Sequence, residues 1–147
     1  MYHKVMILGH LGRDPELRYT PQGTPVATFT VAANRRWTGD EGQRHEETIW
    51  FRVSAFGRLA DVAYQYLRKG MRVYVEGRLT PDRNTGRPRI FTRRDGSVGA
   101  AFEIRADVLR ILQSRTESLR EEKENIPDPF PEDAVADLPG SDEEIPF

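Results

Sequence analysis

The sequence predicts an all-β domain: a small five-stranded barrel with one short α-helix, followed by an acidic C-terminal tail that does not fold. Segments rich in Val, Ile, Phe and Thr recur up to about Leu112, separated by clusters of Gly, Pro, Asn and Asp. Only residues 58–69 show helical periodicity. Beyond Ser114, acidic residues and prolines replace the large apolar ones, and such a composition buries too little surface to offset ordering entropy.

Five strands and a helix follow from these patterns in chain order. The helix, residues 58–69, places its apolar side chains on one face and ends at Gly70. Three strands, a helix and two strands is the order of an OB-fold, a Greek-key barrel whose open face binds oligonucleotides or oligosaccharides. The strands are expected at residues 3–9, 25–37, 45–56, 71–79 and 100–112.

The charge of the chain is divided between its two parts. Residues 1–115 carry 20 Lys and Arg against 12 Asp and Glu, whereas residues 116–147 carry 2 against 11. A basic body of this kind suggests a polyanionic partner, and the acidic tail either faces another partner or competes for the same surface. We therefore expect two parts, a folded domain at residues 1–113 and a disordered tail at residues 114–147.

The third strand separates two faces by its alternation. Ile49, Phe51, Val53 and Ala55 form the expected core face. The opposite, outward face carries two large aromatic rings and an arginine within the set Thr48, Trp50, Arg52, Ser54 and Phe56. Such a face is costly to leave bare in water and suits bases lying over phosphates. Trp37 ends the second strand beside Arg35 and Arg36, and a core or subunit-interface role is the alternative for each aromatic residue.

Two charged loops are expected to form extended arms. Residues 38–44 join the second and third strands, and residues 80–99 join the fourth and fifth. The longer arm places Ile90 and Phe91 among several arginines, with turn residues at Asn84-Thr85-Gly86 and Asp95-Gly96. The pattern favours an arm that wraps the backbone of a nucleic acid. An ordinary hydrated loop is the alternative.

The sequence carries no motif of an active site or metal centre. There is no cysteine, and His3, His10 and His45 are scattered without ligand spacing. No phosphate-binding glycine loop, HExxH pair or serine nucleophile elbow occurs. We expect no enzyme, no cofactor and no metal. No apolar run reaches the ~18 residues of a membrane span, and nothing reads as a secretion signal, so a cytoplasmic, nucleoid-associated location is expected.

Several motifs resemble those of the bacterial single-stranded DNA-binding proteins. GHLGRDPE at residues 9–16 and LRY at 17–19 are similar to the opening of that family. TIWFRV at 48–53, AFGRLA at 55–60, YLRKG at 66–70 and VYVEGRL at 73–79 follow in the family's order and spacing. The resemblance covers about residues 1–112 and resumes at the C-terminus, which reads DEEIPF. In the longer arm, however, this chain has Pro81, Pro88 and a Phe where Trp is frequent.

The resemblance implies a set of binding residues. Base-stacking rings are expected at Trp37, Trp50, Phe56 and Phe91. Basic contacts to DNA are expected from Arg18, Arg35, Arg36, Arg52, Arg58, Lys69, Arg72, Arg78, Arg87, Arg89 and Arg93. The resemblance also implies a partner-docking tip, in which acidic residues attract a basic-rimmed pocket and the terminal Phe is an apolar anchor. Its residues are Asp142, Glu143, Glu144, Ile145, Pro146 and Phe147.

Family members with one such domain usually form homotetramers. The apolar run Val5-Met6-Ile7-Leu8 fits a subunit contact, although packing under a barrel cap explains it equally well.

The sequence therefore predicts a non-enzymatic protein that coats single-stranded DNA with little sequence preference during replication, recombination and repair. Its tail would recruit replication and repair proteins. Two other readings remain: an OB module for RNA or a replication-accessory role, and a metal-dependent nuclease.

Overall fold

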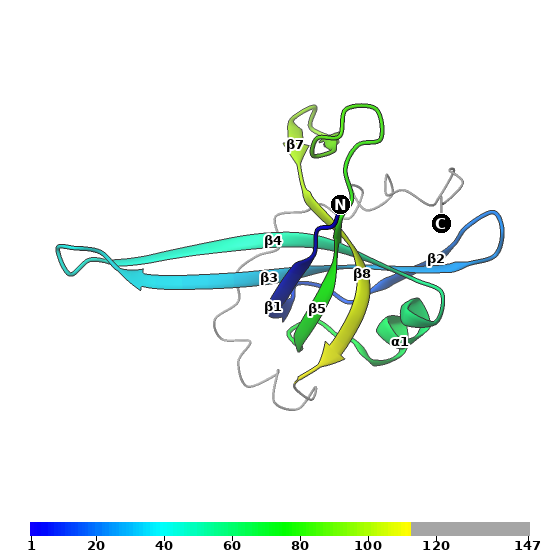
Figure 1. The fold of residues 1–147 in the computed structure, drawn as a ribbon, viewed down its shortest axis with the longest axis horizontal. Helices are drawn as coiled ribbons and strands as arrows, with labels where there is room; N and C mark the ends of the chain where they lie inside the picture. The colour runs from blue at the N-terminus through cyan, green and yellow to red at the C-terminus, as the bar shows by residue number, and fades with distance from the viewer. Residues whose placement is uncertain (113–147) are drawn as a thin grey trace.

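The structure of the chain, a computed structural model, describes residues 1–112 (Figure 1). The predicted tail and its docking tip, Asp142 to Phe147, lie outside the described residues. The described elements are β1 (Val5–Leu11), β2 (Glu16–Tyr19), β3 (Pro25–Thr38), β4 (Arg44–Phe56), α1 (Arg58–Tyr66), β5 (Arg72–Leu79), β6 (Ile90–Thr92), β7 (Val98–Ala100) and β8 (Phe102–Ile111).

Five strands close into a barrel, which confirms the predicted OB-type fold. The order β1-β5-β8-β4-β3 is closed by pairing of β1 with β3, and β2 extends the sheet beyond β3. All neighbours are antiparallel except β4 and β8, which run parallel. Gly9 makes the closure possible, because a Cβ there would collide with the carbonyl oxygen of Ala32 on β3. The three strands absent from the prediction, β2, β6 and β7, are three or four residues long.

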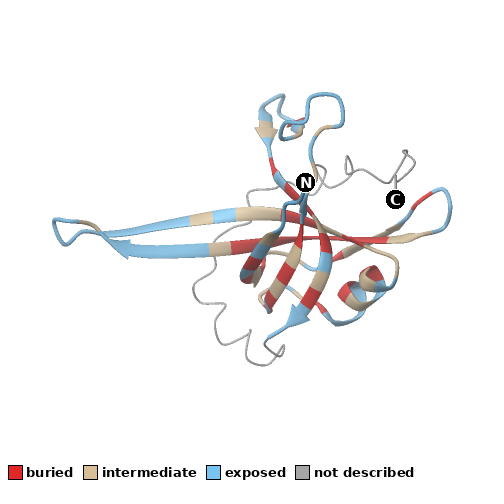
Figure 2. Ribbon diagram, viewed as in Figure 1, coloured by how far each residue is buried: buried red, intermediate tan, exposed pale blue. Residues whose placement is uncertain are grey.

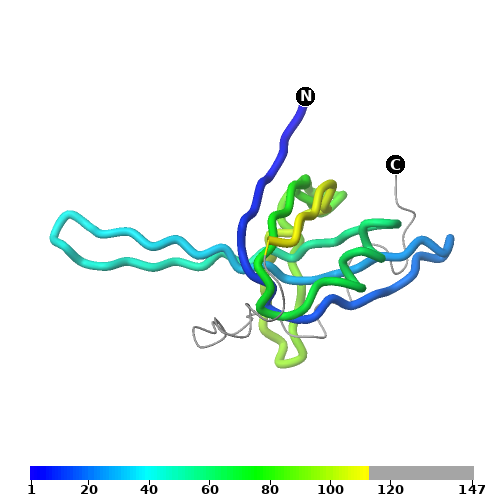
Figure 3. Tube along the Cα trace, turned by 90° about the horizontal axis from the view of Figure 1, so that it is seen from below, coloured from blue at the N-terminus to red at the C-terminus, as the bar shows by residue number. Residues whose placement is uncertain are grey.

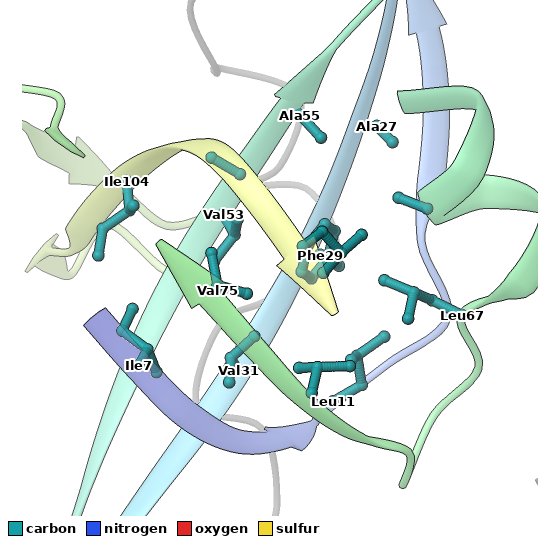
Figure 4. Packing of buried hydrophobic residues seen from close by; sticks show 14 of the residues in the cluster. Ile7, Leu11, Ala27, Phe29, Val31, Val53, Ala55, Leu67, Val75 and Ile104 are labelled. Carbon is teal, nitrogen blue, oxygen red and sulfur yellow. The ribbon is translucent and has the colours of Figure 1, made fainter. Parts of the chain in front are cut away.

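The core fills the barrel and the space beneath the helix (Figure 4). Phe29 and Val31 from β3 meet Val53 from β4, and all three are completely buried. The helix contributes Ala60 and Ala63, and further core residues are Ile7, Leu11, Ala55, Leu67, Val73, Val75, Ile104 and Leu109. At 25 cal/mol per Å², burying each large side chain contributes roughly 1.5–3 kcal/mol.

The helix is three residues shorter than the sequence predicts. Leu67 adopts extended backbone, and Gly70, with a φ of 86°, completes the turn into β5. The Arg68 guanidinium donates hydrogen bonds to the carbonyl oxygens of Tyr64 and Leu67, at 3.0 and 2.6 Å. These bonds satisfy carbonyl groups that a helix end leaves without an intrahelical partner.

Two hairpins project from the barrel. The distal halves of β3 and β4 form a long ribbon whose residues are largely exposed (Figures 1 and 2). The tube view from below shows the same ribbon leaving the barrel on one side (Figure 3). The segment 80–99 carries the short hairpin of β6 and β7, so both predicted arms are present.

Candidate nucleic-acid interface

The β3–β4 ribbon has two faces, and the aromatic residues are divided between them. Directly paired residues on neighbouring strands lie on the same face of a sheet. Trp50 pairs with Ala32 and Phe56 with Val26, which places them on the face away from Phe29. We call this the outer face. Trp37 pairs with His45 and lies in the alternation of Phe29 and Val31. The two predicted stacking tryptophans thus lie on opposite faces of one ribbon.

Trp37 occupies the exposed, distal part of the ribbon. Its ring stacks on His45 with a centroid distance of 5.3 Å, and the Cζ of Arg35 lies 4.9 Å from the Trp37 centroid. The neighbouring arginines are ion-paired across the strands, Arg35 with Glu47 at 3.8 Å and Arg36 with Glu46 at 3.3 Å. The Trp37 residue remains 38% exposed. Part of the Trp37 ring is therefore accessible to a ligand. The arginines beside it, however, are already paired with glutamates.

Trp50 is held in place by a glycine. A Cβ on Gly12 would collide with the Trp50 ring and lie 2.7 Å from Oγ1 of Thr30. The ring also packs against a small cluster formed by Phe91 and Ala101. Trp50 is half-buried, so one part of its surface is supported by protein while the remainder faces water. A ring fixed in this way loses little conformational entropy when a planar group stacks on it.

The β6–β7 arm folds back onto the outer face. Phe91 is 5% exposed, and two guanidinium groups lie near its ring, with Cζ-to-centroid distances of 5.5 Å for Arg52 and 5.2 Å for Arg93. Gly99 permits this packing, since a Cβ there would lie 2.8 Å from Cζ of Phe91. The ring is therefore almost fully covered in this structure, and stacking of Phe91 on a base stays a prediction. In the described structure Phe91 packs against Trp50.

Arg52 is buried rather than directed into water. It is 2% exposed, and Nη1 lies 3.3 Å from Oε1 of Glu103. Nε of Arg89 lies 3.8 Å from Oε2 of Glu103, so one carboxylate joins the barrel to the arm. Burial raises the pKa of Glu103, and the neighbouring Arg52 and Arg89 only partly counter that effect. The alternation placed Arg52 on the correct face, but the arm covers this position.

Phe56 has a partner that the sequence analysis missed. The Cζ of Arg105 lies 4.3 Å from the Phe56 centroid. Arg105 pairs with Ser54 of β4 and with Arg78 of β5. The alternation of β8 contained the signal, because Ile104 and Ala106 are core residues and therefore direct Arg105 outward. Burial and repulsion by Arg78 lower the pKa of Arg105.

The other predicted basic residues are distributed over several surfaces. Arg18 of β2 pairs with Val26 and therefore shares the outer face, where it lies 3.6 Å from Glu16. Arg78 pairs with Arg105 and therefore shares the row of Ser54, next to that of Phe56, whereas Arg72 lies opposite His10 at the other end of β5. Arg58 begins α1, Lys69 donates its backbone N–H to Asp14, and Arg87 lies exposed in the arm.

The predicted core face of β4 is only half buried in the barrel. Val53 and Ala55 are fully buried, but Ile49 is 39% exposed, because the ribbon has left the barrel at that point. Within residues 1–112 no three His, Asp or Glu side chains gather in a way that could hold a metal ion. No helix in this range is both long and apolar enough to cross a membrane.

Comparison with known proteins identifies the family. The model of the single-strand binding protein family matches residues 2–112. A single-stranded DNA-binding protein of Neisseria meningitidis is 40% identical over 79% of this chain and 63% of its own length. One from Helicobacter hepaticus is 40% identical over 78% of this chain and 64% of its own length. The chain thus spans less than two thirds of these relatives.

Two solved structures share the fold. A deletion mutant of the single-stranded DNA binding protein from Thermus aquaticus has a TM-score of 0.58 and 28% identity over 76% of this chain and 51% of its own. A Plasmodium falciparum SSB in complex with ssDNA has a TM-score of 0.61 and 26% identity over 77% and 96%. The motif resemblance is confirmed, and the chain belongs to the single-strand binding protein family.

Proposed function

We propose that this chain binds single-stranded DNA with little sequence preference and acts as a binding protein rather than an enzyme. The observation that carries the proposal is the outer face, where Trp50 and Phe56 lie along one strand with Arg105 beside them. Stacking of a base on an aromatic ring is worth roughly 1–3 kcal/mol and tolerates any base, because every base has a π-face. Membership of the family supports this reading.

Selectivity for single strands follows from what each ligand can offer the rings. A single strand presents bare base faces, whereas a duplex hides them within its stack. Only the electrostatic interaction with phosphates would remain for a duplex, and that interaction weakens as salt rises. We therefore propose that the rings select single strands and that the arginines add salt-dependent affinity. Binding to exposed strands during replication, recombination and repair would associate the chain with the nucleoid.

Assembly into a homotetramer belongs to the same proposal. Met6 and Leu8 alternate with buried Ile7 along β1, yet they are 67% and 51% exposed in the single chain. Adjacent exposed apolar side chains on a strand suit a contact between subunits. We also propose that residues 1–113 form the binding domain and that residues 114–147 recruit replication and repair proteins through the tip.

Binding of labelled ligands, followed by fluorescence anisotropy, tests the proposal. Oligo-dT, a matched duplex and an oligo-U strand are titrated at low and high salt. Trp50→Ala should weaken oligo-dT binding roughly 5- to 150-fold, the loss of about 1–3 kcal/mol. Tyr64→Ala removes an exposed aromatic side chain on α1 and serves as the control. Unchanged oligo-dT affinity in Trp50→Ala, or equal affinity for the duplex, would contradict the proposal. A strong preference for oligo-U over oligo-dT would contradict the proposal and indicate an RNA-binding protein instead.

A further inference from the structure

Two arginines lie directly opposite each other on β5 and β8. Arg78 and Arg105 are paired in the antiparallel register of these strands. Side chains at directly opposed positions have Cβ atoms about 4.5–5.5 Å apart, and like charges there are destabilising. Asp107, the next outward residue of β8, lies 3.7 Å from Nε of Arg78. Asp107 also acts on Arg105, so this carboxylate lies near both guanidinium groups.

The arginine pair continues the aromatic track of the outer face. The Arg105 guanidinium covers Phe56, which pairs with Val26, and Val26 pairs in turn with Arg18 of β2. Two neighbouring rows are joined here: Arg18 lies in the row of Phe56, whereas Arg105 and Arg78 lie in the next row, that of Ser54. The Arg105 side chain connects the rows by covering the Phe56 ring. Neighbouring strands are about 4.8 Å apart, so the distance from β2 to β5 is roughly four such steps.

The surroundings of Arg105 favour an anion. Its guanidinium is partly withdrawn from water, and both burial and repulsion by Arg78 disfavour the charged form, while Asp107 opposes them. A phosphate placed between the two arginines would offset the repulsion and offer several acceptor oxygens. Arginine is well suited to this ligand, because its planar fork of donors matches phosphate geometry.

We propose that Arg105 and Arg78 form a phosphate-binding site of the nucleic-acid strand, next to the base that stacks on Phe56. The inference rests on the proposed function and adds the path that the nucleic acid takes across the sheet. After Trp50 and Phe56 the backbone leaves the β3–β4 ribbon and crosses β8 toward β5. Arg105 has two tasks in this arrangement: its plane supports the Phe56 ring, and its charge neutralises a phosphate.

The salt dependence of binding separates a phosphate contact from a purely structural role. Each phosphate neutralised on a single strand contributes a slope of about −0.7 to log K against log salt. Arg105→Ala should therefore reduce the steepness of the oligo-dT slope by about 0.7, and Arg78→Ala should do the same. Arg105→Lys keeps the charge and should retain the wild-type slope. Phe56→Ala should weaken binding at every salt concentration and leave the slope unchanged.

A matched control is available on the same strand. Arg110→Ala removes an exposed arginine near the end of β8, opposite Tyr74, and should leave the slope as it is. If Arg105→Ala does not fold, Arg105→Gln, which keeps the side chain over the ring, gives the same test. A wild-type slope in both Arg105→Gln and Arg78→Ala, together with weakened binding in Trp50→Ala, would overturn the phosphate site and leave the proposed function standing. Absence of oligo-dT binding by the wild-type protein would overturn both.

Discussion

The buried carboxylate of Glu103 connects the barrel to the β6–β7 arm, and its removal should destabilise the fold strongly. Its side chain is 4% exposed, and that of Arg52, which faces it at 3.3 Å, is 2% exposed. Arg89 approaches the same carboxylate from the arm. In Glu103→Ala, the guanidinium of Arg52 would stay buried without this counter-charge, and Arg89 would lose its contact with β8.

The expected cost follows from the burial of both groups. Breaking a buried ion pair by removing one partner costs about 3–5 kcal/mol, because an uncompensated charge stays in the interior. Glu103→Gln also removes the counter-charge but should cost less than Glu103→Ala, since an amide oxygen still faces Arg52. Glu47→Ala breaks the exposed pair with Arg35 and should cost at most about 1 kcal/mol.

Urea unfolding, followed by far-UV circular dichroism, measures the free energy of unfolding of the wild type and the three variants. The protein concentration is held constant, because any assembly would make the apparent stability depend on it. The order of stability should be wild type, then Glu47→Ala, then Glu103→Gln, with Glu103→Ala the least stable. If Glu103→Ala unfolds at the same urea concentration as Glu47→Ala, the pair does not stabilise the fold as argued.

Three further predictions concern Gly12, which contacts the Trp50 ring, the core residue Phe29, and the pH dependence of stability. Gly12→Ala should displace the Trp50 ring and weaken oligo-dT binding in anisotropy titrations by up to the roughly 1–3 kcal/mol of one stacked base; unchanged affinity would show that this contact is unimportant. Phe29→Ala should lower the free energy of unfolding by about 3–5 kcal/mol in urea titrations, and a loss below about 1 kcal/mol would contradict the burial of this ring. Because burial raises the pKa of Glu103 above its ordinary value of 4.5, its protonated form favours the folded state. This contribution is complete below pH 4.5 and is lost as the pH rises through the raised pKa, so the stability of wild type relative to Glu103→Gln should fall over that range, and a constant difference would count against it.

The positions of the main strands along the chain and the core residues were predictable, because both follow from the alternation of apolar side chains. Val53 and Ala55 follow the period of two, and the interior of the barrel accepts every second side chain of a strand. The length of the projecting ribbon could not be predicted, since alternation does not reveal where β4 leaves the barrel. Ile49 therefore reads as core from its neighbours but lies on the projecting ribbon, where little of the protein covers it.

The site was predictable in its residue types and less so in its arrangement. Trp50 and Phe56 have the parity of the outer face, as the sequence indicates. Burial of Arg52 and Phe91 depends on the arm folding back across the barrel, a contact between segments far apart in the chain that no local pattern encodes. The role of Gly12 became visible only once the Trp50 ring lay over it.

The central claim, that Trp50 stacks on the bases of a single strand, is tested most directly by tryptophan fluorescence. The chain has two tryptophans, so Trp37→Phe leaves Trp50 as the sole reporter and Trp50→Phe leaves Trp37. Each variant is titrated with oligo-dT and with a matched duplex at low and high salt. We predict that oligo-dT quenches Trp50 and that the quenching persists at high salt, while the duplex has little effect. No quenching of Trp50, or equal and salt-sensitive quenching by both ligands, would contradict the account.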